Sequence, residues 1–321
     1  MCTYNGARFL REQLLSVLNQ SLPISELVVS DDGSTDDTLA VVREVLDVFG
    51  STHRAPALVV VHNETPLGVA ANFEQAIRTC SGAIIALADQ DDLWHADRLE
   101  RMVGVFESRP DLLLLHSDAR MVDETGVPLG YTLFEALAID KATKVLVHEG
   151  LGFVPLMRRN LVTGSTTVIR AELARAALPI PAGWLHDEWL AVVAGSIARF
   201  DMLDETTIDY RQHGNNQIGQ LKSTLRYRVR RLLQPRTQRN ARLLARATSL
   251  AKAITGYGPS VPGSYLELTQ DKLKHEVVRS SYARGRLRRI PAVLREQITG
   301  RYVRFGRGWE DAVRDLLQSA Q

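Results

Sequence analysis

The feature that most constrains the fold is an alternation of short apolar runs with amphipathic stretches along the first 116 residues. In the amphipathic stretches, apolar side chains recur every three or four residues, which is the period of a helix. Near-continuous apolar strands that alternate with helices are typical of a mostly parallel sheet covered by helices on both faces. The expected strands are Glu26–Ser30, Ala57–His62, Ala83–Ala88 and Leu112–His116, and the expected helices are Ala7–Leu22, a helix from the Asp31–Asp37 turn to about Phe49, Val69–Thr79 and Ala96–Glu107.

The predicted α/β fold weakens in the middle of the chain and lacks its usual beginning. Ser165–Ile169 and Thr206–Tyr210 still predict strands, and Glu188–Ala198 predicts a helix. A sheet of this kind begins with a strand, but only Met1–Thr3 precede the helix at Ala7. We therefore expect a truncated first strand or a misassigned start.

The charge distribution divides the chain in two. Residues 1–220 hold 17 Lys+Arg and 30 Asp+Glu, whereas residues 221–321 hold 22 and 7. An acidic body with a basic tail indicates that the tail meets something anionic, and a membrane surface and a nucleic acid are both candidates. Within the tail, Leu225–Leu233 and Asn240–Leu250 predict Arg-rich helices, and Gly256–Gly263 predicts a linker.

Composition excludes several other classes of protein. No apolar run approaches the roughly 18 residues of a membrane span, and no basic region followed by an apolar stretch opens the sequence, so we expect a cytoplasmic protein. The two cysteines, Cys2 and Cys80, have no Cys/His cluster around them. We therefore expect neither a disulfide framework nor a zinc site.

Polar side chains follow the expected strands, at the edge where ligands bind in sheets of this type. Several carboxylates at one strand end, as in Asp89–Asp92, repel each other unless a cation or solvent compensates them. A solvated acidic helix N-terminus is the alternative, with about equal weight. Taken alone, Asp31–Ser34 is most simply a turn with a helix cap. Thr3–Gly6 offers an aromatic ring and hydrogen-bonding side chains suited to a planar base.

Two later segments carry chemistry. His186–Trp189 begins a helix, and a carboxylate there could act as general base on a hydroxyl, for which an ordinary aspartate pKa near ~3.9 suffices. A capping aspartate is the alternative. Tyr210–Gly219 is a polar loop in which Arg211 and His213 could meet phosphate or metal. The alternative here is a structural loop with a buried histidine.

Taken in order, these segments resemble the family 2 glycosyltransferases, and most closely the rhamnosyltransferase-like members. The resemblance covers about residues 1–219 and rests on Thr3–Gly6, Asp31–Asp36, Asn63 with Gly68 and Asn72, Asp89–Trp94, His186–Trp189 and Tyr210–Asn216. It implies a Rossmann-like GT-A domain with a nucleotide-sugar-binding half of about residues 1–118 and an acceptor-binding half of about 119–219. An Arg-rich helical region, residues 220–321, would follow.

The resemblance also implies roles for single residues in an inverting transfer that uses Mg²⁺ or Mn²⁺. Asp187 would be the catalytic base that deprotonates the acceptor hydroxyl. Asp92 would bind the cation, with Asp91 and His213 beside it. The residues implied in nucleotide-sugar binding are Thr3, Tyr4, Asn5, Asp31, Asp32, Asn63, Gly68, Asn72, Asp91 and Arg211. Among these, Tyr4 would stack near the base, and Asp32 would accept from the pyrimidine N–H.

The implied reaction moves a sugar, with rhamnose as one candidate, from a dTDP- or UDP-linked donor to a glycan or lipid-linked acceptor in cell-surface polysaccharide synthesis. The Gln-x-x-Arg-Trp signature of processive synthases is absent, so one or a few transfers per acceptor are expected. The basic tail would place the protein on the inner face of the plasma membrane. A solvated helical appendage or a dimer contact is the alternative for the tail. A non-catalytic nucleotide-sugar-binding protein and an inactive truncated transferase remain alternatives for the whole chain, and a nucleic-acid module ranks last.

Overall fold

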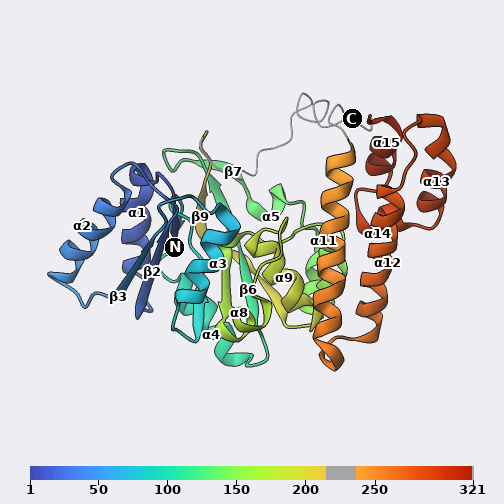
Figure 1. Ribbon diagram of the computed structural model, residues 1–321. Helices are drawn as coiled ribbons and strands as arrows, with labels where there is room; N and C mark the ends of the chain where they lie inside the picture. Colours follow the sequence, from blue (N-terminus) through green and yellow to red (C-terminus); the bar gives the residue numbers. More distant parts are fainter. Residues whose placement is uncertain (215–235, 320–321) are drawn as a thin grey trace.

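The computed structural model describes residues 1–214 and 236–319. A small sheet lies at one end of the molecule, a larger sheet in the middle and long helices at the other end (Figure 1). The strands are β1 (Cys2–Thr3), β2 (Glu26–Asp31), β3 (Ala57–His62), β4 (Ile84–Ala86), β5 (Leu93–Trp94), β6 (Leu114–Val122), β7 (Pro128–Thr132), β8 (Thr167–Arg170) and β9 (Phe200–Arg211). The α-helices are α1 (Ala7–Leu18), α2 (Thr38–Gly50), α3 (Val69–Thr79), α4 (Arg98–Ser108), α5 (Leu133–Ala136), α6 (Lys141–His148), α7 (Phe153–Leu156), α8 (Ala171–Ala177), α9 (His186–Ser196), α11 (Arg236–Gly256), α12 (Gly263–Ser280), α13 (Arg286–Ile298), α14 (Arg301–Phe305) and α15 (Trp309–Leu317), with short 3₁₀ helices η1 (Gly164–Thr166) and η2 (Gly258–Ser260).

The first sheet has the order β1-β2-β3 and is entirely parallel. Strand β2 is apolar on both faces because helices cover both. Leu27 and Val29 belong to the core that α1 and α2 complete, whereas Val28 belongs to the core that Phe73 of α3 completes. Side chains alternate between the two faces of a strand, so the apolar run in β2 serves two helical layers.

The short first strand is present as the two-residue β1. The ammonium group of Met1 donates to the carbonyl of Val28 at 2.7 Å, and the Ser30 amide donates to the Met1 carbonyl at 2.9 Å. On its other side, the Cys2 amide donates to the carbonyl of Ala88 at 3.2 Å. These bonds bring the chain ends after β1, β2 and β4 to the same edge.

The second sheet has the order β4-β8-β6-β9-β5, with β7 paired to β6, and it is mixed. Only β6 and β9 run parallel; the other pairs are antiparallel. The α/β class, the helices on both faces and the helical C-terminal region are confirmed, but the mostly parallel arrangement holds for the first sheet alone. For the pair β6 and β7 the physical reason is a tight connection, which antiparallel strands permit. In that turn Asp123 Oδ1 accepts from the amides of Thr125 and Val127 at 2.8 and 3.0 Å.

The C-terminal helices pack into the body of the molecule. Helices α11 and α12 form a pair (Figure 1) whose Leu250, Ile254 and Tyr265 lie in the same core cluster as Trp189 of α9. The predicted boundary at 219/220 and the predicted helix 225–233 lie outside the described residues. The predicted helix 240–250 lies within the longer α11, and the predicted linker contains η2.

Much of the basic charge of this region is used internally. The carboxylate of Asp315 is fully buried and pairs with Arg239 and, at 2.8 Å, with Arg279. It also accepts from the Tyr302 hydroxyl at 2.7 Å, and the Asp315 carbonyl accepts from Arg289 at 2.7 Å. Buried charges of this kind require partners, so these arginines stabilise the helical region and are not free for an external anion.

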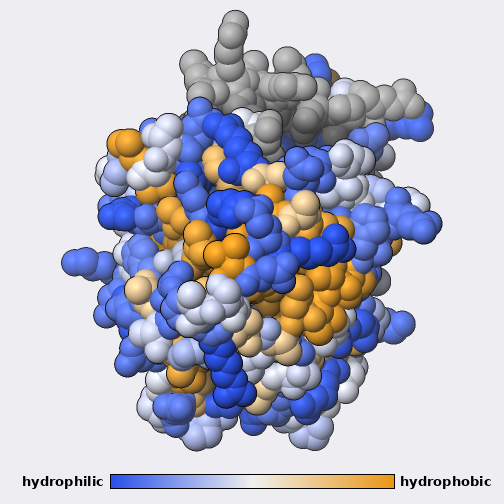
Figure 2. Space-filling view, turned by 90° about the vertical axis from the view of Figure 1, so that its left-hand side faces the viewer, coloured by the Kyte–Doolittle hydropathy of each residue, from blue (hydrophilic) through white to orange (hydrophobic). Residues whose placement is uncertain are grey.

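The surface on the side of α2 and β3 carries an apolar area (Figure 2). Strand β3 is the edge strand of the first sheet, and Leu58 on it is 37% exposed, while Val48 on α2 is 64% exposed. Among the helices that the structure describes, none is both long and apolar enough to cross a bilayer.

Candidate active site

A cavity of about 300 Å³ lies where the chain leaves β1, β2 and β4, with α9 on the opposite side. Its volume is at the lower end of the range for small-molecule sites. Six of the residues singled out from the sequence line it: Thr3, Tyr4, Asp32, Asn72, Asp91 and Asp187. Further lining residues, to which the sequence assigned no individual role, are Asp89, Gln90, Asn160, Thr163, His186 and Tyr210. The expected convergence of polar strand ends is therefore present.

Tyr4 is held at the mouth of the cavity by Gln90. The Gln90 side chain accepts from the Tyr4 amide at 2.8 Å and donates to the Tyr4 carbonyl at 3.1 Å, as a neighbouring strand would. A side chain at Gly6 would collide with the Gln90 amide and would displace it from Tyr4. The Tyr4 side chain is 41% exposed. Its ring therefore has a fixed backbone and an open face.

Asp31, the last residue of β2, and Asp32, which follows it, have different roles. Asp31 is buried behind the cavity and accepts from Thr3 Oγ1 at 2.7 Å, from the Ser34 amide at 3.0 Å and from His62 Nδ1 at 2.9 Å. Burial acts against these bonds, but together the bonds prevail and lower the pKa of Asp31. Asp31 does not appear in the wall of the cavity, so within this structure its connection to the site runs through Thr3.

Asp32 reaches the cavity wall and also organises the loop after β3. Its carboxylate accepts from the amides of Leu67 and Gly68 at 2.7 and 2.9 Å and from Asn63 Nδ2 at 3.2 Å. Gly68 has a φ of +84°, a left-handed conformation that other residues adopt at a cost. Asn63 and Gly68 thus lie behind Asp32, and they position it.

Asn72 and Asn5 also make defined hydrogen bonds. Asn72, on the first turn of α3, accepts from the Ser30 hydroxyl at 2.6 Å and donates to the Ser30 carbonyl at 2.9 Å. Asn5 has a φ of +48°, and its side chain accepts from the Thr35 amide at 2.8 Å. Asn72 lines the cavity, whereas Asn5 holds the loop after β2 against the loop after β1.

Three carboxylates gather where the chain leaves β4. Burial, and then the neighbouring charges of Asp91 and Asp187, raise the pKa of Asp89 to about 7. Burial and the charges of Asp91 and Asp89 raise the pKa of Asp92 well above its usual range. Oδ2 of Asp92 is buried and has no hydrogen-bond partner within the described part of the chain. The cluster therefore concentrates negative charge that the protein alone leaves uncompensated.

The loop after β9 closes over this cluster. The amide of Arg211 donates to Asp92 Oδ1 at 3.0 Å, and its guanidinium donates to the Asp91 carbonyl at 2.9 Å and to Glu12 at 2.7 Å. His213 Nε2 lies 2.8 Å from Asp91 Oδ2, and its ring stacks on Phe9. Arg211 and His213 thus hold the two aspartates from behind.

Asp187 faces the carboxylate cluster across the cavity, at the first turn of α9. Burial, and then the charge of Glu188, raise the pKa of Asp187 to about 7, although hydrogen bonds from the amides of Glu188 and Gly164 and from Asn160 act in the opposite direction. An ordinary aspartate pKa would have sufficed for a general base at this position. A carboxylate with a pKa near 7 is a stronger base and is still half ionised at neutral pH.

His186, next to Asp187, was not singled out from the sequence. Its ring stacks on Phe73 of α3 with centroids 3.7 Å apart, and neither ring nitrogen has a hydrogen-bond partner among residues 1–214 and 236–319. Burial lowers the pKa of His186 to about 3, so it is neutral. A side chain at Gly164 would collide with the imidazole. No local sequence signal revealed this packing, because Gly164, Phe73 and His186 are far apart in the chain.

Helix α11 fixes the position of α9 from outside. Arg246 pairs with Glu188 at 2.8 Å, and its guanidinium lies 4.1 Å above the ring of Trp184. The Trp184 indole donates to the Ser249 hydroxyl at 2.9 Å. Both contacts join α11 to residues beside Asp187, so the C-terminal region supports the candidate base.

The sequence is similar to those of known proteins. Residues 1–163, more than half of the chain, match the family described as Glycosyl transferase family 2. An uncharacterized glycosyltransferase of Nostoc sp. is 26% identical over 226 residues, which cover 69% of this chain and 66% of that protein. EpsE of Bacillus subtilis, named as a candidate glycosyltransferase, is 32% identical over 127 residues, covering 40% and 44%. TuaG of the same organism, named as a candidate glycosyltransferase of teichuronic acid biosynthesis, is 28% identical over 144 residues, covering 44% and 54%. The chain spans less than two thirds of the length of each.

Two solved structures share the fold. S. aureus TarS 1–349 in complex with UDP-GlcNAc aligns with a TM-score of 0.59 at 14% identity, covering 98% of this chain and 88% of that chain. The mannosyltransferase PcManGT from Pyrobaculum calidifontis, in complex with GDP-Man and Mn²⁺, aligns with a TM-score of 0.51 at 16% identity, covering 98% and 82%. The expected GT-A fold is therefore confirmed.

Proposed function

The chain belongs to family 2 of the glycosyltransferases, and on that premise we propose that it moves a sugar from a nucleoside diphosphate to an acceptor hydroxyl with inversion at the anomeric carbon. One observation carries the proposal: a single cavity brings Tyr4 and Asp32 together with Asp91 on one side and Asp187 on the other. Such a transfer needs an aromatic ring for the nucleobase (Tyr4), a hydrogen-bond acceptor for its N–H group (Asp32), a metal ligand (Asp91) and a proton acceptor (Asp187).

In the proposed complex, the base of the donor lies against Tyr4, with Asp32 accepting its N–H group. Thr3 and Asn72 line the adjoining wall. Asp32 Oδ1 already accepts from the Leu67 amide and from Asn63, but Oδ2 accepts only from the Gly68 amide and has a second lone pair that can accept again. Asn5, Asp31, Asn63 and Gly68 support this wall from behind.

The residues after β4 and β9 fit a divalent cation. Asp92 has a buried oxygen without a partner, Asp91 is beside it, and His213 touches Asp91. Although three aspartates follow β4, no three or more His, Cys, Asp or Glu side chains within residues 1–214 and 236–319 are placed so that together they could hold a metal ion. This suits Mg²⁺ or Mn²⁺, which use one or two carboxylates and take further ligands from substrate phosphates and water. When bound, the cation would neutralise charge on the departing diphosphate. In this proposal Arg211 orients Asp91 and Asp92. Its contact with the diphosphate, expected from the sequence, stays a prediction.

Asp187 performs the proton transfer in the proposed reaction. Its carboxylate takes the proton of the acceptor hydroxyl while the acceptor oxygen forms a bond to C1 of the sugar. The bond between C1 and the diphosphate oxygen breaks on the opposite face, and the electron pair leaves with the nucleoside diphosphate. One displacement inverts the anomeric centre and needs one base. The hydrogen bonds from Glu188 and Gly164 fix the orientation of Asp187 for this step.

We propose a pyrimidine donor, dTDP- or UDP-linked, with rhamnose as the first sugar to test, and a glycan or lipid-linked acceptor in cell-surface polysaccharide synthesis. The TuaG name, which refers to teichuronic acid, and the UDP-GlcNAc complex of TarS support this class of reaction.

Calorimetric titration with UDP, dTDP and GDP, each with and without Mn²⁺, tests the donor proposal. We expect a pyrimidine diphosphate to bind at least about tenfold more tightly with Mn²⁺ than without it, because the cation links the carboxylates to the phosphates. A folded sample that binds none of the three nucleotides would remove the proposal and favour a role without transfer.

An apolar stripe on α13 supports contact with the inner face of an anionic membrane. The stripe consists of Leu287, Ile290, Leu294 and Ile298. Their spacing of three or four residues places them on one helix face, with exposed fractions from 37% to 84%. Arg286, Arg288 and Arg295 on the same helix are exposed as well. An apolar face bordered by arginines is typical of helices that lie in a bilayer interface.

Replacing Leu287 or Ile298 by serine is therefore expected to weaken binding to vesicles of phosphatidylglycerol and phosphatidylcholine by about tenfold each. Vesicle flotation measures the bound fraction. Val145→Ser, an equally polar change at an exposed position of α6, is the matched control. Equal flotation of all three variants and the parent would show that α13 does not meet the membrane.

A further inference from the structure

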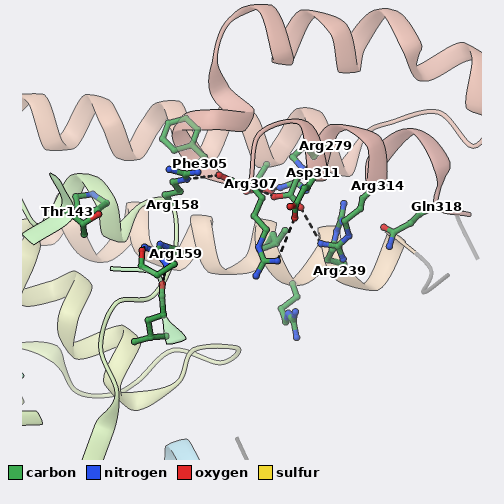
Figure 3. Close-up of a pocket in the computed structure, with 18 of the residues that line it drawn as sticks. Thr143, Arg158, Arg159, Arg239, Arg279, Phe305, Arg307, Asp311, Arg314 and Gln318 are labelled. Carbon is green, nitrogen blue, oxygen red and sulfur yellow. Dashed lines mark hydrogen bonds and ion pairs between the residues drawn. The ribbon is translucent and has the colours of Figure 1, made fainter. Parts of the chain in front are cut away.

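A second and larger cavity, of about 1420 Å³, lies between the body and the C-terminal helices. Among residues 1–214 and 236–319, seven arginines and four carboxylates line it: Arg158, Arg159, Arg239, Arg242, Arg279, Arg307 and Arg314 with Asp140, Glu276, Glu310 and Asp311. Figure 3 shows Arg158 and Arg159 reaching in from the body, while Arg239, Arg307 and Arg314 come from the helical region. The cavity wall therefore carries an excess of positive charge.

The arginines differ in whether a carboxylate neutralises them. Arg239 and Arg279 pair with the buried Asp315. By contrast, Arg158 donates to the Gly306 carbonyl at 3.0 Å, and Arg159 donates to the carbonyls of Leu137 and Ala138. Within residues 1–214 and 236–319, neither of these two nor Arg242 forms an ion pair.

The charges of these arginines act on one another. Burial, and then the charge of Arg158, lower the pKa of Arg159; the charge of Asp140 acts in the opposite direction, and that of Arg307 adds to the lowering. Arg307 faces its partner Glu310 only at 3.7 Å, with both side chains exposed, so this pair compensates little. An anion in the cavity would gain from the guanidinium groups of Arg158, Arg159 and Arg242, which form no ion pair in the described residues, because each can donate two hydrogen bonds to phosphate oxygens.

The position of the cavity relates it to the candidate active site. Arg158 and Arg159 directly precede Asn160, which lines the smaller cavity together with Asp187. The segment 155–164 thus forms a wall of both cavities.

We propose that the large cavity binds a phosphate group of the acceptor, with Arg158, Arg159 and Arg242 as its contacts, so that the acceptor hydroxyl is presented to Asp187. This inference rests on the proposed function for the acceptor's role, but the phosphate site itself does not depend on it. A lipid-linked diphosphate and a phosphodiester polymer share the required chemistry.

The test is a binding experiment on the full chain in EDTA with saturating UDP, which keeps probes out of the donor site. The probes are farnesyl diphosphate, farnesol, inorganic pyrophosphate and a trimer of glycerol phosphate. The variants are Arg158→Gln, Arg242→Gln and the pair together, with Arg54→Gln, an exposed arginine between α2 and β3, as matched control. We expect each single variant to bind the preferred phosphate probe about tenfold more weakly, and Arg54→Gln to equal the parent.

Each outcome decides the proposal. Tighter binding of farnesyl diphosphate than of farnesol or the trimer, lost in the variants, supports the site and identifies a lipid diphosphate. Tighter binding of the trimer supports the site and identifies a polymer. Binding of pyrophosphate that the variants leave unchanged, or of any probe only at millimolar concentration, means an adventitious ion only and overturns the proposal. Failure of the proposed function would appear separately, as absence of nucleotide binding when the same protein preparations are titrated with Mn²⁺ and without EDTA.

Discussion

Replacing Asp187 by asparagine is expected to lower the kcat of sugar transfer about 10³-fold while donor binding changes by less than about threefold. General base catalysis contributes typically 10²–10⁴-fold, and asparagine keeps the shape of the side chain but cannot accept the proton. Asp187 lies across the cavity from Tyr4 and Asp32, so the donor contacts survive the change. Radiolabelled transfer assays and calorimetry with the nucleotide measure the two quantities.

The pH dependence of kcat/KM of the parent enzyme tests the role of Asp187 a second time. Because burial raises the pKa of Asp187 to about 7, the carboxylate is protonated and inactive below this pH. We expect kcat/KM to rise about tenfold per pH unit below 7 and to level off above it. A profile that is flat between pH 5.5 and 8 would assign the proton transfer to another group.

Stability measurements separate loss of the base from loss of the fold. The folded-state pKa of Asp187 is raised above the unfolded value, so the folded protein binds more protons and this residue's contribution to stability falls as pH rises from about 4 to about 7. Asp187→Asn should therefore melt at a higher temperature than the parent at pH 8, with the difference closing toward pH 4. Asp111→Asn, at an exposed position, should change neither activity nor melting. Retention of more than a tenth of the transfer rate by Asp187→Asn would contradict the assignment.

The first half of the fold could be predicted because its periodicity is strong. The predicted helix Val69–Thr79 has the observed bounds of α3, and the strand Ala57–His62 those of β3. The direction in which the strands pair was harder to predict, since an apolar strand has the same sequence pattern in a parallel and in an antiparallel sheet. The strand expected at Leu112–His116 is observed as β6, from Leu114 to Val122, because its second half carries Asp118 and Arg120 and looks like a loop.

The candidate site was predictable only to the level of strand ends. The topological rule brought Tyr4, Asp32 and Asp91 to one edge, and the cavity contains all three. Residues that act by packing across the fold were not visible in the sequence. Gln90 hydrogen-bonds the Tyr4 backbone and Asn160 lines the cavity with Asp187, yet the sequence assigned neither residue a role of its own. Their roles depend on contacts between segments roughly 27 to 86 residues apart, which no local pattern encodes.

Replacing Asp92 by asparagine is expected to abolish the effect of Mn²⁺ on nucleotide binding, with a loss of at least about 100-fold in affinity and about 10³-fold in transfer. The change preserves the acceptor at Oδ1 for the Arg211 amide, so the loop after β9 keeps its anchor. It removes the negative charge of the buried oxygen that has no hydrogen-bond partner in the described chain. Calorimetry with UDP and dTDP, with and without Mn²⁺, measures the loss.

Without metal the same change should stabilise the protein. Burial and the charges of Asp91 and Asp89 raise the pKa of Asp92, so its ionisation opposes folding, and stability falls as pH rises from the unfolded pKa toward the folded one. At pH 8 in EDTA, Asp92→Asn should therefore melt above the parent, because a repulsive carboxylate is gone.

Added Mn²⁺ with UDP should raise the melting temperature of the parent alone, since a ligand at 100 times its Kd stabilises by about 2.7 kcal/mol. Asp37→Asn, at an exposed position before α2, should keep the full Mn²⁺ response. If Asp92→Asn showed the same response, the cation would have to bind elsewhere, and the gathering of three carboxylates after β4 would need an explanation other than a metal.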